Sequence, residues 1–137
     1  MTSPDERHVL ETTTGPETLD EIQQALDDLW SDRDIPEMVR MHTALAVSEI
    51  AANIIEHSGD GRPVRLRMEV ELVPEVIRVT FTDDGHPSPV DLSNVAMPDE
   101  MSERGRGLAI AFRVLDELSY RRDGEGNHWT LVRRTDT

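Results

Sequence analysis

Three polar side chains of different chemistry recur at four-residue intervals within an apolar segment of the chain. Glu49, Asn53 and His57 lie in the run ALAVSEIAANIIEHS, residues 44–58. Residues four apart in an α-helix lie on nearly the same face, so a carboxylate, an amide and an imidazole would line one side of the helix. Burying these groups is costly unless polar partners satisfy them. The spacing predicts a polar ligand against this face, and the alternative is an ordinary buried helix whose polar residues are satisfied internally.

An alternating segment, VTFTDDG at residues 79–85, ends in two aspartates and a glycine. Taken structurally, Asp-Asp-Gly is good turn chemistry. A functional interpretation also exists, because the carboxylate of Asp83 at the end of a buried strand can accept a hydrogen bond from an exocyclic amino group such as that of adenine. Gly85 would let a flat base approach the backbone closely. The segment alone leaves both interpretations open.

Two glycines separated by one residue precede a helix-forming segment in ERGRGLAIA, residues 103–111. Backbone N–H groups at the start of a helix bind phosphate, and Gly105 and Gly107 would permit its close approach. Arg104 and Arg106 add positive charge to an otherwise acidic protein. The alternative is a flexible loop that enters a helix, and a single Gly-x-Gly does not decide between the two.

Composition and charge exclude several classes of function. The 137 residues include 28 acidic and 14 basic side chains, which gives a formal net charge of −14. A field of this sign repels phosphate backbones, so direct nucleic-acid binding is not expected. No cysteine is present and the five histidines show no close metal-ligand spacing, so neither a disulfide nor a structural metal is expected. No segment approaches the roughly 20 apolar residues of a membrane span and the N-terminus does not resemble a signal peptide, so we expect a cytoplasmic protein without membrane contact.

The elements that must position these residues are predicted from hydrophobic periodicity. Helices are predicted at 14–30, opened by a capping box of Thr14 and Glu17, at 36–56 and at 107–117. Strands are predicted at 8–13, 64–72, 77–82, 118–122 and 128–134. The last two strands are joined across a turn at 123–127, and 84–104 is predicted to be a long functional loop. We expect one domain with residues 1–6 as a flexible tail, in an α+β fold of two layers with helices on one face of a mixed, mainly antiparallel sheet.

Together, the motifs and their order resemble the ATP-binding domain shared by gyrase, heat-shock chaperones, histidine kinases and mismatch-repair ATPases. The order is Glu-x3-Asn-x3-His on a helix, a strand ending in Asp-x-Gly, and Arg-Gly-x-Gly-Leu opening a helix. Within this superfamily, the short length and the phrase AVSEIAANIIEHSG, residues 46–59, look most like the bacterial anti-sigma factor serine/threonine kinases. The resemblance spans nearly the whole chain and implies a histidine-kinase-like ATPase fold that binds ATP and Mg²⁺.

The resemblance implies a role for each polar residue of the predicted helix. Asn53 would bind Mg²⁺ through its side-chain oxygen, a suitable ligand for a hard cation. Glu49, one turn earlier, would be the general base for an incoming serine hydroxyl. His57 closes the motif, and it either contacts the nucleotide or caps the helix.

The other motifs would contact the nucleotide. Asp83 would accept a hydrogen bond from the adenine amino group with Gly85 beside the base, and Thr130 matches a threonine that the superfamily often places near adenine. The phosphates would be held at the start of the third helix by Arg104, Gly105, Arg106, Gly107 and Leu108. One of the two arginines would meet the γ-phosphate.

Two departures from the superfamily pattern affect the expected activity. His86 and Pro87 follow Gly85 where the superfamily often has a second glycine, and the lid, roughly 89–103, lacks lysine. Phosphoryl transfer needs little covalent help from the protein, so activity is still expected, at a low rate.

These expectations define one function and two alternatives. The resemblance implies an ATP-dependent serine/threonine protein kinase of the anti-sigma type, which phosphorylates an anti-anti-sigma protein, sequesters a sigma factor and forms a homodimer. The first alternative is a non-catalytic module that binds ATP, or has lost it, and only sequesters a regulatory partner. The second is the excised catalytic domain of a histidine kinase, although no segment could serve as its phospho-accepting helix pair.

Overall fold

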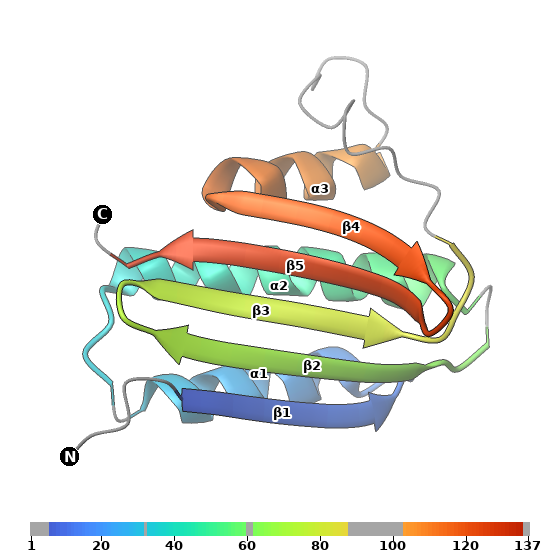
Figure 1. Cartoon of the computed structure of the whole chain (residues 1–137), viewed down its shortest axis with the longest axis horizontal. Coiled ribbons are helices and arrows are strands. Elements are labelled where there is room, and N and C mark those ends of the chain that lie inside the picture. The colour runs from blue at the N-terminus through green and yellow to red at the C-terminus, as the bar shows by residue number, and fades with distance from the viewer. Residues whose placement is uncertain (1–5, 32, 60–61, 88–102, 136–137) are drawn as a thin grey trace.

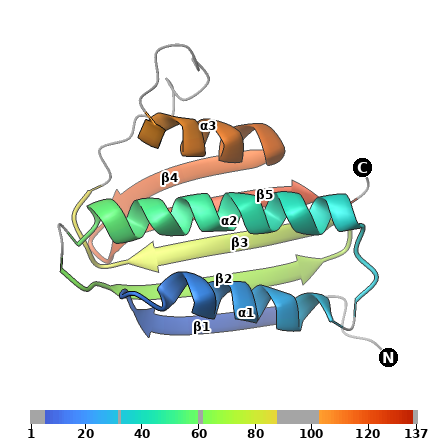
Figure 2. The ribbon, with the colours of Figure 1, turned by 180° about the vertical axis from the view of Figure 1, so that it is seen from behind.

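The fold is a sheet covered on one side by helices. The computed structural model describes residues 6–31, 33–59, 62–87 and 103–135, and within them the side chains of all residues except 6 and 103–107. In this part of the chain the strands are β1 (Glu6–Thr13), β2 (Arg65–Val73), β3 (Val76–Asp83), β4 (Glu117–Asp123) and β5 (Gly126–Arg134). The helices are α1 (Thr18–Trp30), α2 (Glu37–His57) and α3 (Glu103–Val114). All three helices lie on the same side of the sheet (Figures 1 and 2), which confirms the predicted two-layer α+β fold. None of the helices described combines the length and apolarity that a membrane span requires.

The strands are ordered β1-β2-β3-β5-β4, and each of the four pairings is antiparallel. The chain leaves β3, forms α3 and returns as a hairpin whose second strand, β5, inserts beside β3 (Figure 1). This order brings the last residue of β3 next to the second residue of β5, so that Asp83 lies opposite Asn127. Two segments more than forty residues apart in sequence therefore meet at one end of the sheet.

The two faces of the sheet differ because side chains alternate along each strand. On β3, Ile77, Val79, Phe81 and Asp83 are buried against the helices, and the residues between them lie on the opposite face. We call these sides the helical face and the free face. Trp129 lies opposite Phe81 and is also buried, and burial of each such aromatic side chain stabilises the fold by about 1.5–3 kcal/mol. Asp83 is therefore the polar end of an apolar row.

The predicted capping box at the start of the first helix is wrong. α1 begins at Thr18, and the residue before it makes no side-chain capping bond. Thr14 instead exchanges two hydrogen bonds with Val64: its backbone N–H donates to the carbonyl oxygen, and its Oγ1 accepts the backbone N–H, both at 2.9 Å. The Thr18 hydroxyl oxygen accepts the Gly15 N–H at 2.7 Å. A tertiary contact to the start of β2 has displaced the local cap.

The other boundaries agree with the predictions to within a few residues. α2 is displaced by a single residue from the predicted helix, and the buried stripe of α1 is as expected: Ile22, Leu26, Leu29 and Trp30. α3 begins four residues earlier than predicted, and the β4–β5 turn contains two residues, 124 and 125, rather than five. The predicted lid lies outside the described residues up to position 102, and so does the predicted tail apart from residue 6, which begins β1.

Candidate functional site

The C-terminal end of α2 is joined to the end of β3 by a close backbone contact. The N–H of His86 donates to the carbonyl oxygen of Ser58 at 2.6 Å. A Cβ at Gly85 would lie 2.3 Å from that same oxygen, so a larger residue does not fit there without a backbone shift. Asn53 precedes Ser58 by five residues, which is about 7.5 Å along the helix axis. The glycine of the Asp-x-Gly motif thus sets how closely the strand end approaches the polar residues of α2.

Asp83 is a buried carboxylate with one oxygen in use and one free. The side chain is 1% exposed, and its Oδ1 accepts hydrogen bonds from the Gly85 N–H and from Asn127 Nδ2, each at 2.9 Å. Its Oδ2 is also buried and has no hydrogen-bond partner among the described residues. Leaving a buried polar atom unsatisfied costs about 1–3 kcal/mol, and more for a charged group. The arrangement therefore fits a ligand that donates a hydrogen bond to Oδ2.

Asn127 is a site residue that the sequence did not indicate. Its side chain is fully buried, and Nδ2 donates to Asp83 Oδ1 and, at 2.7 Å, to the carbonyl oxygen of His86. Its Oδ1 accepts from the Tyr120 hydroxyl and, at 3.0 Å, from Arg122. The same Arg122 nitrogen also donates to the Gly85 carbonyl oxygen at 2.9 Å. The β4–β5 hairpin therefore clamps the loop that follows β3.

The predicted polar face of α2 lies within the helix as expected. Asn53 is buried at 8% exposure, whereas Glu49 and His57 are partly exposed. Within the part of the chain that the structure describes, the side chains of Asn53 and Glu49 make no hydrogen bond or ion pair. His57 Nε2 lies 3.7 Å from the Glu56 carboxylate. An amide oxygen and a carboxylate one helical turn apart are thus available to a cation and to a hydroxyl group.

The start of α3 presents backbone donors rather than a glycine loop. Gly105 and Gly107 lie inside the helix, within its first five residues. The first four N–H groups of a helix have no partner within it, so this end retains the capacity to bind an anion. Leu108 has a buried side chain in the hydrophobic core, which leaves its backbone as the part able to contact a ligand.

Thr130 is not brought to Asp83. It pairs with Thr80 on the free face, whereas Asp83 pairs with Asn127 on the helical face. Neighbouring residues of a strand point to opposite faces, so Thr130, at an odd spacing from Asn127, faces away from the site. This register disagrees with the predicted contact between Thr130 and an adenine held at Asp83.

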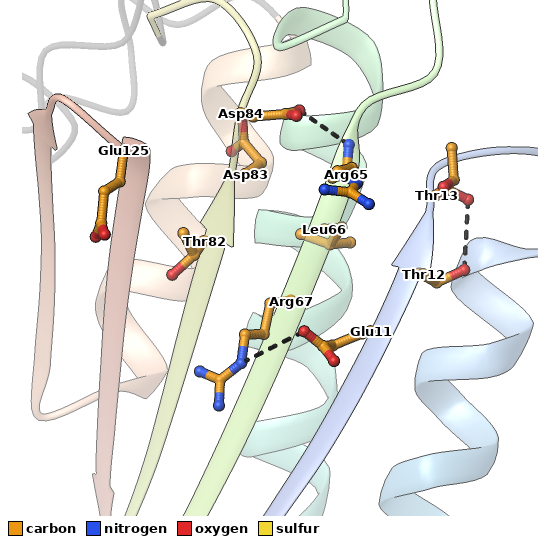
Figure 3. A pocket seen from close by; sticks show the side chains of 10 residues that line it. All are labelled: Glu11, Thr12, Thr13, Arg65, Leu66, Arg67, Thr82, Asp83, Asp84 and Glu125. Atoms are coloured by element: carbon orange, nitrogen blue, oxygen red, sulfur yellow. Dashed lines mark hydrogen bonds and ion pairs between the residues drawn. The ribbon is translucent and has the colours of Figure 1, made fainter.

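A groove of about 490 Å³ lies at the end of β2 and β3, and its lining includes the buried Asp83 as well as free-face residues such as Arg67 and Thr82. Figure 3 shows Asp84 accepting the Arg65 backbone N–H, at 2.9 Å, and Arg67 beside Glu11, at 3.9 Å. Arg67 also lies 2.8 Å from Glu69. Arg67 is thus ion-paired, whereas the Asp83 carboxylate in the same lining keeps an Oδ2 that has no partner among the described residues.

Three side chains at the β4–β5 turn, Asp123, Glu125 and His128, bring potential metal-ligand atoms within 4.8 Å of one another. Asp123 Oδ1 lies 2.8 Å from His128 Nε2 and accepts the backbone N–H of Glu125 at 2.8 Å. The hydrogen bond with His128, followed by those with Glu125 and Arg121, holds the pKa of the Asp123 carboxyl well below its usual range. This set stabilises the turn that precedes Asn127.

Comparison with known proteins agrees with this geometry. A model of the family described as "Histidine kinase-like ATPase domain" matches residues 12–133. A search of curated proteins found no match. Among solved structures, the chain is similar to the histidine kinase domain from the Erythrobacter litoralis EL346 blue-light activated histidine kinase, with a TM-score of 0.55 and 25% identity. The alignment covers 85% of this chain and 59% of that chain, so this chain spans less than two thirds of the matched chain's length.

Proposed function

The chain belongs to the histidine kinase-like ATPase domain family, which implies ATP binding, typically with Mg²⁺, and from this premise we propose that it is an ATP-dependent serine/threonine protein kinase of the anti-sigma type, acting in the cytoplasm. Its substrate would be an anti-anti-sigma protein and its second partner a sigma factor, with the kinase acting as a homodimer. The family supports nucleotide binding and kinase-type chemistry, whereas the protein substrate, the partners and the dimer rest on the resemblance of residues 46–59 and its neighbouring motifs.

The observation that carries the proposal is the unpartnered oxygen of Asp83. Oδ2 is buried and has no donor among the described residues, and it lies at the strand end that is joined to α2. The exocyclic amino group of adenine supplies the missing donor, and a hydrogen bond to a charged acceptor contributes about 1.5–3 kcal/mol.

The phosphates would extend from this base contact toward α2 and the start of α3. Free backbone N–H groups in the first turn of α3 suit an anion, and Arg104 or Arg106 would add charge beside the γ-phosphate. Asn53 would hold Mg²⁺ through its amide oxygen, and the ion would supply positive charge that offsets the charge of the phosphates.

Phosphoryl transfer would then be assisted by Glu49. The serine or threonine hydroxyl oxygen forms a bond to the γ-phosphorus, the bond between that phosphorus and the β–γ bridging oxygen breaks, and ADP leaves. The hydroxyl proton passes to the Glu49 carboxylate. Glu49 lies one helical turn before Asn53, so the base and the metal ligand share one face of α2.

The proposal is tested with two variants of α2. Glu49→Ala should leave ATP affinity unchanged and reduce phosphate transfer about 10²–10⁴-fold, the usual contribution of a positioned general base. Asn53→Ala should impair both Mg-dependent ATP binding and transfer. The measurements are calorimetric titration with ATP, with and without Mg²⁺, and single-turnover transfer of radiolabelled phosphate to purified anti-anti-sigma proteins encoded in the same genome.

Ser48→Ala is the matched control, because it removes one polar group from the neighbouring position of α2. This variant should bind and transfer as the wild type does. Wild-type transfer by Glu49→Ala would remove the proposed base. Tight partner binding by a wild-type protein that transfers no phosphate would favour the non-catalytic sequestering module.

A further inference from the structure

The side-chain amide of Asn127 is held in one orientation by its surroundings. A side-chain amide offers two donor hydrogens and two acceptor lone pairs. Both donors are used, on Asp83 Oδ1 and the His86 carbonyl oxygen, and both acceptor positions are used, by Tyr120 and Arg122. A flipped amide would place an N–H against the Arg122 guanidinium, which can only donate, and its oxygen against two acceptors, Asp83 Oδ1 and the His86 carbonyl oxygen. The network therefore admits only one orientation.

This fixed amide determines which oxygen of Asp83 is left without a donor from the described residues. Oδ1 receives two donors, the Gly85 N–H and Asn127 Nδ2, and Oδ2 receives none from the described residues. Without Asn127, the carboxylate keeps a single protein donor and can rotate about its terminal torsion, which is broad. The two oxygens would then share one backbone N–H, and no single acceptor would be aimed into the site.

We propose that Asn127 is a positioning residue that makes the site selective for purines bearing a 6-amino group. It acts through Asp83 rather than by touching the ligand, and this inference rests on the proposed nucleotide binding. A purine without the amino group would leave Oδ2 unpaired, so selectivity depends on the carboxylate remaining in one orientation.

The experiment compares the affinities of ATP and of purine riboside triphosphate, which lacks the 6-amino group, by calorimetric titration. The wild type should prefer ATP by about 10- to 100-fold. Asn127→Ala should reduce this ratio by about tenfold, with the affinity for purine riboside triphosphate changed less than about twofold. A purely structural role would weaken both nucleotides alike and leave the ratio unchanged, which would overturn the inference.

Tyr120→Phe provides a second variant in case Asn127→Ala does not fold. It removes one donor to the Asn127 oxygen and retains the ring, which packs against Trp129 with 4.7 Å between ring centroids. The ATP preference should fall about two- to fivefold. Thr130→Val on the free face is the matched control and should keep the wild-type ratio.

The outcomes separate this inference from the proposed function. A folded wild type that binds neither nucleotide overturns both. A wild type that prefers ATP, with the same preference in Asn127→Ala and Tyr120→Phe, overturns the positioning role alone. A reduced preference in either variant, with Thr130→Val unchanged, supports it.

Discussion

Asp83, the last residue of β3, and Asp84, which directly follows the strand, have surroundings that differ in kind. Asp83 lies on the helical face, is 1% exposed and keeps one oxygen without a partner among the described residues. Asp84 is exposed and accepts the Arg65 N–H, so it fastens the strand end to β2. The turn interpretation of the motif therefore applies to Asp84, and the ligand interpretation is proposed for Asp83 alone.

The free face and the helical face of the sheet also differ in how their charged groups are satisfied. The free face carries charged side chains that form ion pairs with one another, such as Arg7 and Arg67 with Glu69. The helical face is mostly apolar and ends in one unsatisfied carboxylate. The unsatisfied buried oxygen thus distinguishes Asp83 from the ion-paired side chains of the free face.

The largest expected difference between the faces is in stability. Phe81→Ala removes a fully buried ring from the helical face and should lower the free energy of unfolding by about 3–5 kcal/mol. Thr80→Ala, one residue earlier on the free face, should cost less than about 1 kcal/mol. Urea unfolding followed by circular dichroism measures both, and equal losses would contradict the distinction.

A smaller loss of stability is expected from a substitution at the contact between the end of β3 and the end of α2. Gly85→Ala places a Cβ 2.3 Å from the Ser58 carbonyl oxygen and should lower the free energy of unfolding by about 1–3 kcal/mol, with weaker ATP binding because the Asp83 loop is displaced. Gly124→Ala is the control, since its Cβ would meet no atom within 4 Å. If both variants behave alike in urea titration and calorimetry, the close contact does not set the site.

The smallest effect concerns the turn that precedes Asn127, and it depends on pH. The folded-state pKa of Asp123 lies below its ordinary value of 3.8, so its contribution to stability is present above that value and is lost as pH falls through the folded pKa. Between about pH 5 and about pH 2, the wild type should lose more stability than Asp123→Asn. Urea midpoints across this range check the prediction, and parallel curves for the two proteins would refute it.

Periodic patterns made the fold largely predictable. Alternation in 64–82 predicted β2 and β3, and the apolar spacing of α2 predicted its extent to within one residue. The capping box failed because Thr14 bonds to Val64, fifty residues away in sequence, and no local pattern reports such a contact. α3 was predicted to start four residues too late, because its glycines were assigned to the preceding loop. Tertiary context can override the low helix propensity of glycine.

The site was predictable only where its residues form a local pattern. Asp83 and the polar residues of α2 stand out within single elements. Asn127 acquires its role only when β5 pairs with β3, and the turn had been predicted to include it. Thr130 was assigned to the site instead, and the register rather than the residue type shows that it lies on the other face.

The central claim is tested most directly by comparing the ATP affinities of Asp83→Asn and Asp84→Asn by titration calorimetry. In Asp83→Asn, the amide oxygen can still accept from Gly85 and Asn127, so the fold should persist, while an N–H₂ group replaces the acceptor that faces the ligand. We expect a loss of about 10- to 150-fold for Asp83→Asn and less than about twofold for Asp84→Asn. Unchanged affinity in Asp83→Asn, or equal losses in the two variants, would contradict the claim.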